Sequence, residues 1–193
     1  MLEKMNWFGL AAGITTILLI VSSLFIPWWK FQVGKDPALV EANVSPIYTD
    51  FNFIGNAFTI PLIWAINLAS ILYLTAGGII MLVYSIKPTK LYSKRLLGFS
   101  YKKPLYFIIF FIIGLIALSF ILKGMFNLDV PLSGSAQTTL PSNLIQGVSI
   151  SVFMSAEFLW PFWLAVLTAG LCIGAKLYHR KLVPVSMPNV AKQ

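Results

Sequence analysis

Four apolar runs alternate with polar segments along the chain and determine most of what the sequence predicts. The runs cover residues 7–29, 58–86, 104–122 and 158–177, and each holds about 19 residues or more with almost no charge. A helix rises about 1.5 Å per residue, so each run can cross the roughly 30 Å hydrocarbon core of a bilayer. The pattern predicts an all-α integral membrane protein, a bundle of four transmembrane helices.

Composition agrees with this interpretation. Of the 193 residues, 58% are hydrophobic and 10% are charged, with a mean hydropathy of +0.83. Roughly 25% charge is usual in a soluble domain. The polar segments are also shorter than the roughly 40 residues at which an independent domain becomes stable. We therefore expect residues 1–193 to form a single membrane domain.

The cations are distributed unevenly between the polar segments. Eleven of the 14 lysine and arginine residues lie before the first run, between the second and third runs, or at and beyond the end of the fourth. The positive-inside rule then places both termini, the loop 87–103 and the tail 178–193 in the cytoplasm. The loops 30–57 and 123–157 are predicted to lie outside the cell membrane. The net charge of +8 is interpreted as orientation and attraction to anionic headgroups, not as nucleic-acid binding.

Small residues at helical spacing predict where helices pack closely. The pairs are Gly9 with Gly13, Ala165 with Ala169, and Gly170 with Gly174. Two small residues four positions apart let the backbones of membrane helices approach each other. We therefore expect a neighbouring helix against the first run and a central position for the fourth. Similar short segments in the two halves also predict a duplication of helix hairpins, two plus two.

Tryptophans mark the predicted outer ends of the first and fourth helices. They are Trp28, Trp29, Trp160 and Trp163. An indole ring is apolar but carries one N–H donor, which suits the headgroup level of a bilayer. We predict that these four residues are interface anchors.

Three polar residues are candidates for a ligand site. They are Asn67 in the second run, Gln146 in the second outer loop and Glu157 at the start of the fourth run. We interpret Asn67 first as a contact between helices, because an unsatisfied amide in hydrocarbon costs several kcal/mol. Glu157 is interpreted first as a carboxylate that stabilises the start of the fourth helix. Asn43 begins an Asn-Val-Ser glycosylation sequon on the outer side.

The outer loops are expected to be irregular, with a short helical turn at 37–44. Residues 143–153 fit two patterns, because Val148, Ile150 and Val152 alternate as in a strand while the whole segment also fits an interfacial helix. We favour the helix, since a lone strand leaves its backbone unpaired at a membrane surface.

The sequence offers little catalytic chemistry. It contains one cysteine, Cys172, and one histidine, His179, and no acid or base in the middle of any run. Membrane enzymes and metal or haem centres need several such groups together, so we expect no catalytic residues, no cofactor and no metal. The layout resembles the general plan of tetraspan membrane proteins, without the motifs that mark their known families.

We therefore interpret the chain as a non-catalytic accessory or structural subunit of a larger membrane complex, either respiratory and energy-converting or part of the envelope. The expected partners are other membrane subunits and membrane lipids, including anionic headgroups. The alternative is a small homo-oligomeric transporter, channel or lipid-handling protein, in which Asn67, Glu157 and Gln146 form the polar lining.

Overall fold

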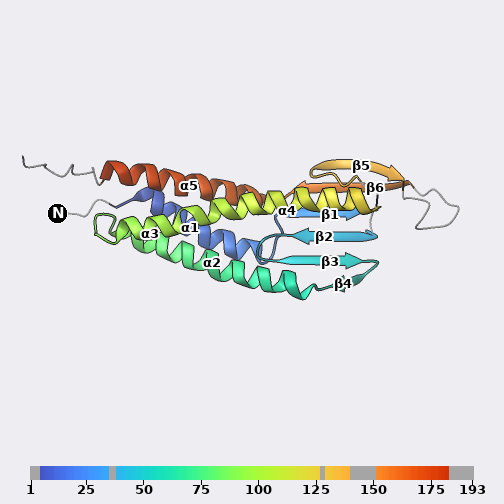
Figure 1. Cartoon of the computed structure of the whole chain (residues 1–193), viewed down its shortest axis with the longest axis horizontal. Helices are drawn as coiled ribbons and strands as arrows, with labels where there is room; N and C mark the ends of the chain where they lie inside the picture. Colours follow the sequence, from blue (N-terminus) through green and yellow to red (C-terminus); the bar gives the residue numbers. More distant parts are fainter. Residues whose placement is uncertain (1–4, 35–37, 127–128, 140–150, 183–193) are drawn as a thin grey trace, which may run out of the picture.

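The computed structural model describes residues 5–34, 38–126, 129–139 and 151–182. The helices are α1 (Trp7–Ser23), α2 (Pro61–Ile86), α3 (Ser93–Ser100), α4 (Lys102–Phe126) and α5 (Trp160–Leu182). The strands are β1 (Trp29–Val33), β2 (Val40–Val44), β3 (Thr49–Phe53), β4 (Asn56–Phe58), β5 (Gly134–Thr139) and β6 (Ser151–Phe158). Figure 1 shows an elongated molecule with the strands at one end, here called the sheet end, and helices alone at the other, the helix end.

Three helical segments are long and apolar enough to cross a membrane. They are α2, the segment Ser93–Gly124 that combines α3 with most of α4, and α5. The remaining apolar helix, α1, is shorter, with 17 residues. It ends at Ser23, and the predicted end of the first run, Trp29, instead belongs to β1. The chain is thus mostly helical and compatible with a multi-pass membrane protein.

The prediction of an all-α protein is wrong, because both predicted outer loops contribute strands to one antiparallel sheet. The strand order is β4-β3-β2-β1-β6-β5. The central strand β1 pairs with β2 and with β6, so that Phe31 lies opposite both Ala42 and Ala156. Val40–Val44 forms β2 in place of the predicted helical turn. Residues 143–150 lie outside the described residues, and 151–153 begin β6.

β6 is not a lone strand, because it pairs with β5 of the same loop on one side and with β1 of the first outer loop on the other. The two helix hairpins nevertheless differ, since four strands connect α1 to α2 whereas two described strands lie between α4 and α5. The duplication therefore stays a prediction.

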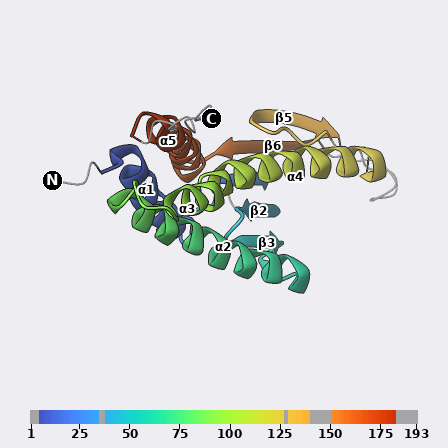
Figure 2. The same ribbon diagram turned by 60° about the vertical axis from the view of Figure 1, so that its left-hand side comes forward.

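One face of the sheet is apolar and packs against α4. Side chains alternate between the two faces of a strand, and Phe31, Ala42 and Met154 all belong to the buried core that includes Phe111 and Leu115 of α4. Figures 1 and 2 show α4 extending from the helix end along the strands. The sheet therefore shares a hydrophobic core with α4 and with parts of α1 and α5.

Trp28 and Trp29 lie in this core and not at a lipid interface. Their exposed fractions are 0% and 1%. The Trp28 indole donates to Ser23 Oγ at 2.7 Å, and the Trp29 indole donates to the backbone oxygen of Leu132 at 2.8 Å. The prediction of interface anchors is wrong for this pair, because protein atoms satisfy both N–H groups. Trp160 and Trp163 are 52% and 61% exposed, so for them it stays a prediction.

Close contacts join α1 to α2. A methyl group at Gly13 would lie 2.5 Å from Leu82 Cδ2, and one at Gly9 would overlap Ser85. Asn6 caps α1 by accepting from the Gly9 N–H at 3.0 Å. Its amide also donates to Tyr84 of α2 at 2.7 Å. Both glycines thus face α2 directly.

The small residues of α5 divide into two groups. Ala165 and Ala169 are buried, and Gly174 lies against the Phe8 ring of α1. Gly170 is exposed, and a methyl group there would meet no atom of the described chain within 4 Å. One face of α5 therefore packs against α1 while Gly170 points away from it.

Candidate functional site

The second face of the sheet is polar and is the most distinctive surface of the molecule. We call it the polar sheet face. Its members alternate with the buried core residues along each strand. They include Lys30 and Gln32 of β1, Glu41 and Asn43 of β2, Asp50 and Asn52 of β3, Ser135 and Gln137 of β5, and Ser155 and Glu157 of β6.

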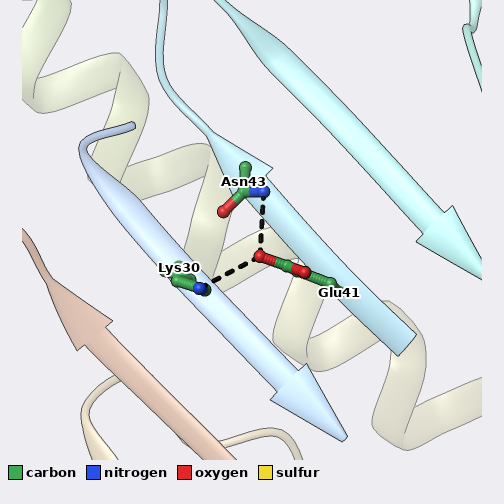
Figure 3. A network of polar contacts seen from close by, with 3 residues as sticks. All are labelled: Lys30, Glu41 and Asn43. Carbon is green, nitrogen blue, oxygen red and sulfur yellow. Dashed lines mark hydrogen bonds and ion pairs between the residues drawn. The ribbon is translucent and has the colours of Figure 1, made fainter. Parts of the chain in front are cut away.

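A three-residue polar network lies in the middle of this face (Figure 3). Lys30 Nζ lies 3.1 Å from Glu41 Oε1, and the Asn43 amide donates to the same oxygen at 3.1 Å. The hydrogen bond from Lys30 lowers the pKa of Glu41 below its ordinary value, so the carboxylate stays charged at neutral pH. A partly exposed pair of this kind contributes about 0.2–1 kcal/mol to stability. Its main effect is to hold the three side chains in place and to neutralise Lys30.

Two adjoining hollows lie on either side of Lys30. The first has a volume of 360 Å³ and extends over β6 and β5 to Glu157 and Ser135. The second has a volume of 470 Å³ and extends toward Glu41 and Phe153. Lys30, Gln32 and Ser155 line both, so the two hollows lie side by side, and we call them together the depression around Lys30. Polar side chains of Lys30, Gln32 and Ser155 lie beside apolar groups such as Ala156 and Phe153 in its lining.

Glu157 belongs to this face and does not stabilise the start of a helix. It lies in β6 opposite Lys30, while α5 begins at Trp160 and has no acid in its first turn. The interpretation of Glu157 as a helix-start carboxylate is therefore wrong. Since Lys30 pairs with Glu41, the Glu157 carboxylate has no ion pair among the described residues.

Asn67 joins α2 to the sheet and not to another helix. With the amide oriented to satisfy its neighbours, its oxygen accepts from the Thr49 N–H at 3.0 Å and its nitrogen donates to the Pro46 oxygen at 3.3 Å. Asn67 also lines a 360 Å³ cavity between α2 and β3, together with Tyr48 and Asp50. Burial, and to a lesser degree the charge of Asp50, raises the pKa of Tyr48. The two hydrogen bonds of the Asn67 amide hold the turn between β2 and β3 against α2.

The three predicted ligand residues are not brought together in the described structure. Asn67 lines the cavity beside α2, whereas Glu157 lines the depression on the polar sheet face. Gln146 lies outside the described residues. Asn43, the predicted glycosylation position, has its amide nitrogen bonded to Glu41, and its modification stays a prediction.

Lys103 is a buried cation that the sequence interpretation missed. Its exposed fraction is 1%, and Nζ lies 3.1 Å from the centre of the Tyr73 ring and 3.5 Å from that of Phe99. Nζ has no hydrogen-bond partner among the described residues. Gly77 makes room for this side chain, because a methyl group there would lie 2.7 Å from Lys103 Cδ. Contact with two aromatic faces stabilises the ammonium group.

One sequence signal does point to this arrangement. Phe99 lies four positions before Lys103, on the same helical face. The distribution of cations places Lys103 in the polar loop 87–103, although it lies within the apolar segment Ser93–Gly124.

Comparisons with known proteins add no assignment to this geometry. No protein-family model matches the sequence, and a search of the curated proteins finds no significant match. Across residues 5–34, 38–126, 129–139 and 151–182, no three His, Cys, Asp or Glu side chains are grouped to hold a metal.

Proposed function

We propose that the chain is a four-span protein of the cell membrane with both termini in the cytoplasm and the sheet outside. In this topology α1 also crosses the membrane, in addition to the three longer helical segments. Its 17 helical residues cover about 25 Å, and the chain continues apolar to Ile26. The charges support this orientation. Lys94, Arg95 and Arg180 belong to the helix end, whereas Glu41 and Glu157 belong to the sheet.

We infer that the protein is a non-catalytic accessory subunit of a larger membrane complex and that the polar sheet face binds a partner subunit. The observation that carries this proposal is the depression around Lys30 on the polar sheet face. Because Glu41 neutralises Lys30, the remaining charges of the face, Asp50 and Glu157, are both negative. The expected partner therefore presents lysine, arginine or amide donors outside the membrane.

The size of the face indicates what else the partner contacts. Strands lie about 4.8 Å apart and rise about 3.3 Å per residue, so six short strands offer roughly 400–500 Å². A stable interface uses about 800 Å² on each side. Exposed apolar side chains at the far ends of the strands supply the remaining contact, since Leu39 and Ile54 are 49% and 62% exposed. The Ile54 N–H donates to the Leu39 oxygen at 2.8 Å, so these residues are adjacent.

The test is purification of the full chain from its native membrane in mild detergent, with quantitative mass spectrometry of what accompanies it. We expect a stoichiometric partner subunit, whose recovery falls about tenfold or more when Asp50→Lys and Glu157→Lys are combined, because like charges then face each other across the interface.

The matched control is Asp129→Lys, which reverses a charge that pairs with Lys123 and lies outside the strands. It should leave partner recovery unchanged. A chain that purifies alone, or an equal loss with Asp129→Lys, would contradict the proposal.

One observation favours the alternative, a small homo-oligomeric transporter, channel or lipid-handling protein. Lys103 is an ionisable residue buried within a candidate span, and such residues commonly mark transport pathways. If Lys103 carries this function, Lys103→Met should abolish ion or solute flux in reconstituted vesicles while the protein stays folded. Lys123→Met, which removes an exposed cation at the other end of α4, should not. Vesicles with wild-type protein that show no flux would contradict a transporter or channel function.

A further inference from the structure

A second cavity lies at the helix end, where the described cations gather. Its volume is 340 Å³. We call it the basic cavity. The residues that line it come from α3, the junction with α4, and the end of α5: Lys94, Leu97, Gly98, Tyr101, Lys102, Lys176, His179 and Arg180.

Tyr101 organises the cations of this cavity. Lys176 Nζ donates to the Tyr101 hydroxyl at 2.8 Å and lies 4.3 Å from the centre of its ring. Lys102 Nζ lies 5.8 Å from the same ring. Tyr101 is the one residue between α3 and α4. This junction therefore brings Lys102 of α4 close to Lys176 of α5.

The cavity contains no described counter-charge. Lys94, Lys102, Lys176 and Arg180 line it, and no acidic residue does. Both ion pairs of the described residues, Lys30 with Glu41 and Lys123 with Asp129, lie elsewhere. Four like charges in a small volume repel one another and create a positive potential. A bound anion relieves this repulsion.

Next to the basic cavity, α4 and α5 expose apolar side chains on their surfaces. On α4, Tyr106 and Ile109 follow Lys102 at spacings of four and seven residues and are 43% and 42% exposed. On α5, Ile173 precedes Lys176 by three residues and is 41% exposed. An anion bound among these cations therefore lies beside an exposed apolar surface. A phospholipid combines both parts, a phosphate and hydrocarbon chains.

We propose that the basic cavity is a binding site for the phosphate group of an anionic phospholipid on the cytoplasmic side. Lys176 and Arg180 bind the phosphate from α5, Lys94 and Lys102 bind it from the other side, and the acyl chains lie along α4 and α5. This proposal rests on the membrane orientation proposed above and not on the partner subunit, so failure of one leaves the other intact.

The test measures lipid binding to the full chain in a neutral detergent by native mass spectrometry, with phosphatidylglycerol and phosphatidylcholine as probes. We expect the wild-type protein to prefer phosphatidylglycerol. Combining Lys176→Gln with Arg180→Gln should weaken that binding about 30-fold, with little change for phosphatidylcholine, since each cation near a headgroup contributes about a factor of five.

Two further variants make the result specific. Lys87→Gln with Lys90→Gln removes the same charge from exposed positions at the helix end outside the cavity, and should change binding less than about twofold. Lys94→Gln with Lys102→Gln removes the other two cations and leaves the hydrogen bond from Lys176 to Tyr101 intact. This pair should also weaken binding about 30-fold, and it tests the proposal if the first pair fails to fold.

Three results would overturn the proposal. They are no preference for phosphatidylglycerol, an equal loss in the Lys87 and Lys90 variant, and displacement of the lipid by inorganic phosphate at equal concentration. The last would assign the cavity to a free anion.

Discussion

Replacing Trp28 by alanine is expected to lower the free energy of unfolding by about 3–5 kcal/mol. The ring is fully buried and makes edge contacts with Phe111 of α4 and Phe162 of α5, at centroid distances of 5.2 and 6.2 Å. It also donates to Ser23 Oγ at 2.7 Å. Alanine would leave a cavity where α1, α4, α5 and the sheet meet. Denaturant unfolding in detergent should show the loss of free energy, and thermal unfolding should show a fall in Tm of about 10 °C.

Two variants separate the contributions of the ring and its N–H group. Trp28→Phe keeps most of the apolar volume and loses the hydrogen bond, so it should cost about half as much as alanine. Trp160→Ala removes an indole that is 52% exposed and should have a small effect. If Trp28→Ala and Trp160→Ala lower stability equally, Trp28 does not hold the core together.

Gly13→Leu is expected to separate α1 from α2 and to cost about 3 kcal/mol or more. The first added carbon alone would lie 2.5 Å from Leu82 Cδ2 and 3.2 Å from the Leu82 backbone nitrogen. The backbone atom cannot move without shifting α2, so overpacking costs more here than the usual 1–3 kcal/mol. The measurement is the midpoint of denaturant unfolding, with cysteine crosslinking between α1 and α2 as a second readout.

The matched control is Gly170→Leu on α5. Gly170 is exposed, and a methyl group there meets no described atom within 4 Å. Leucine is a better helix former than glycine by close to 1 kcal/mol, so this variant should be neutral or slightly more stable. Equal destabilisation by both substitutions would show that the glycine spacing of α1 has no special packing role.

The helices could be predicted from the sequence because hydrocarbon and protein interiors both select long apolar runs. Pro61–Ile86 differs from the predicted 58–86 by three residues at its start. The first run was predicted too long, because Trp28 and Trp29 are as apolar as the helix before them. Only the alternation of Trp29, Phe31 and Val33 with Lys30 and Gln32 indicates that a strand has begun.

The sheet could not be predicted from either loop alone. Strands of three to eight residues are too short to be stable in isolation. Their pairing joins β1 to β6, which are about 125 residues apart in the chain. The arrangement of the polar sheet face depends on this pairing, so Glu157 was assigned to a helix. The sequence predicts a contact between Asn67 and another helix, whereas its partner is the turn between β2 and β3.

The direction of the strands decides from which side a neighbour approaches. In Figure 1 the strands run along the long axis of the molecule, roughly parallel to the helices. If the helices cross the bilayer, the polar sheet face stands upright on the membrane and looks sideways. A subunit that binds it must therefore stand next to this protein as a lateral neighbour in the same bilayer, with its own domain at the same height above the headgroups. Among the described residues, a soluble protein descending from above would meet the ends of the strands, where Leu39 and Ile54 lie.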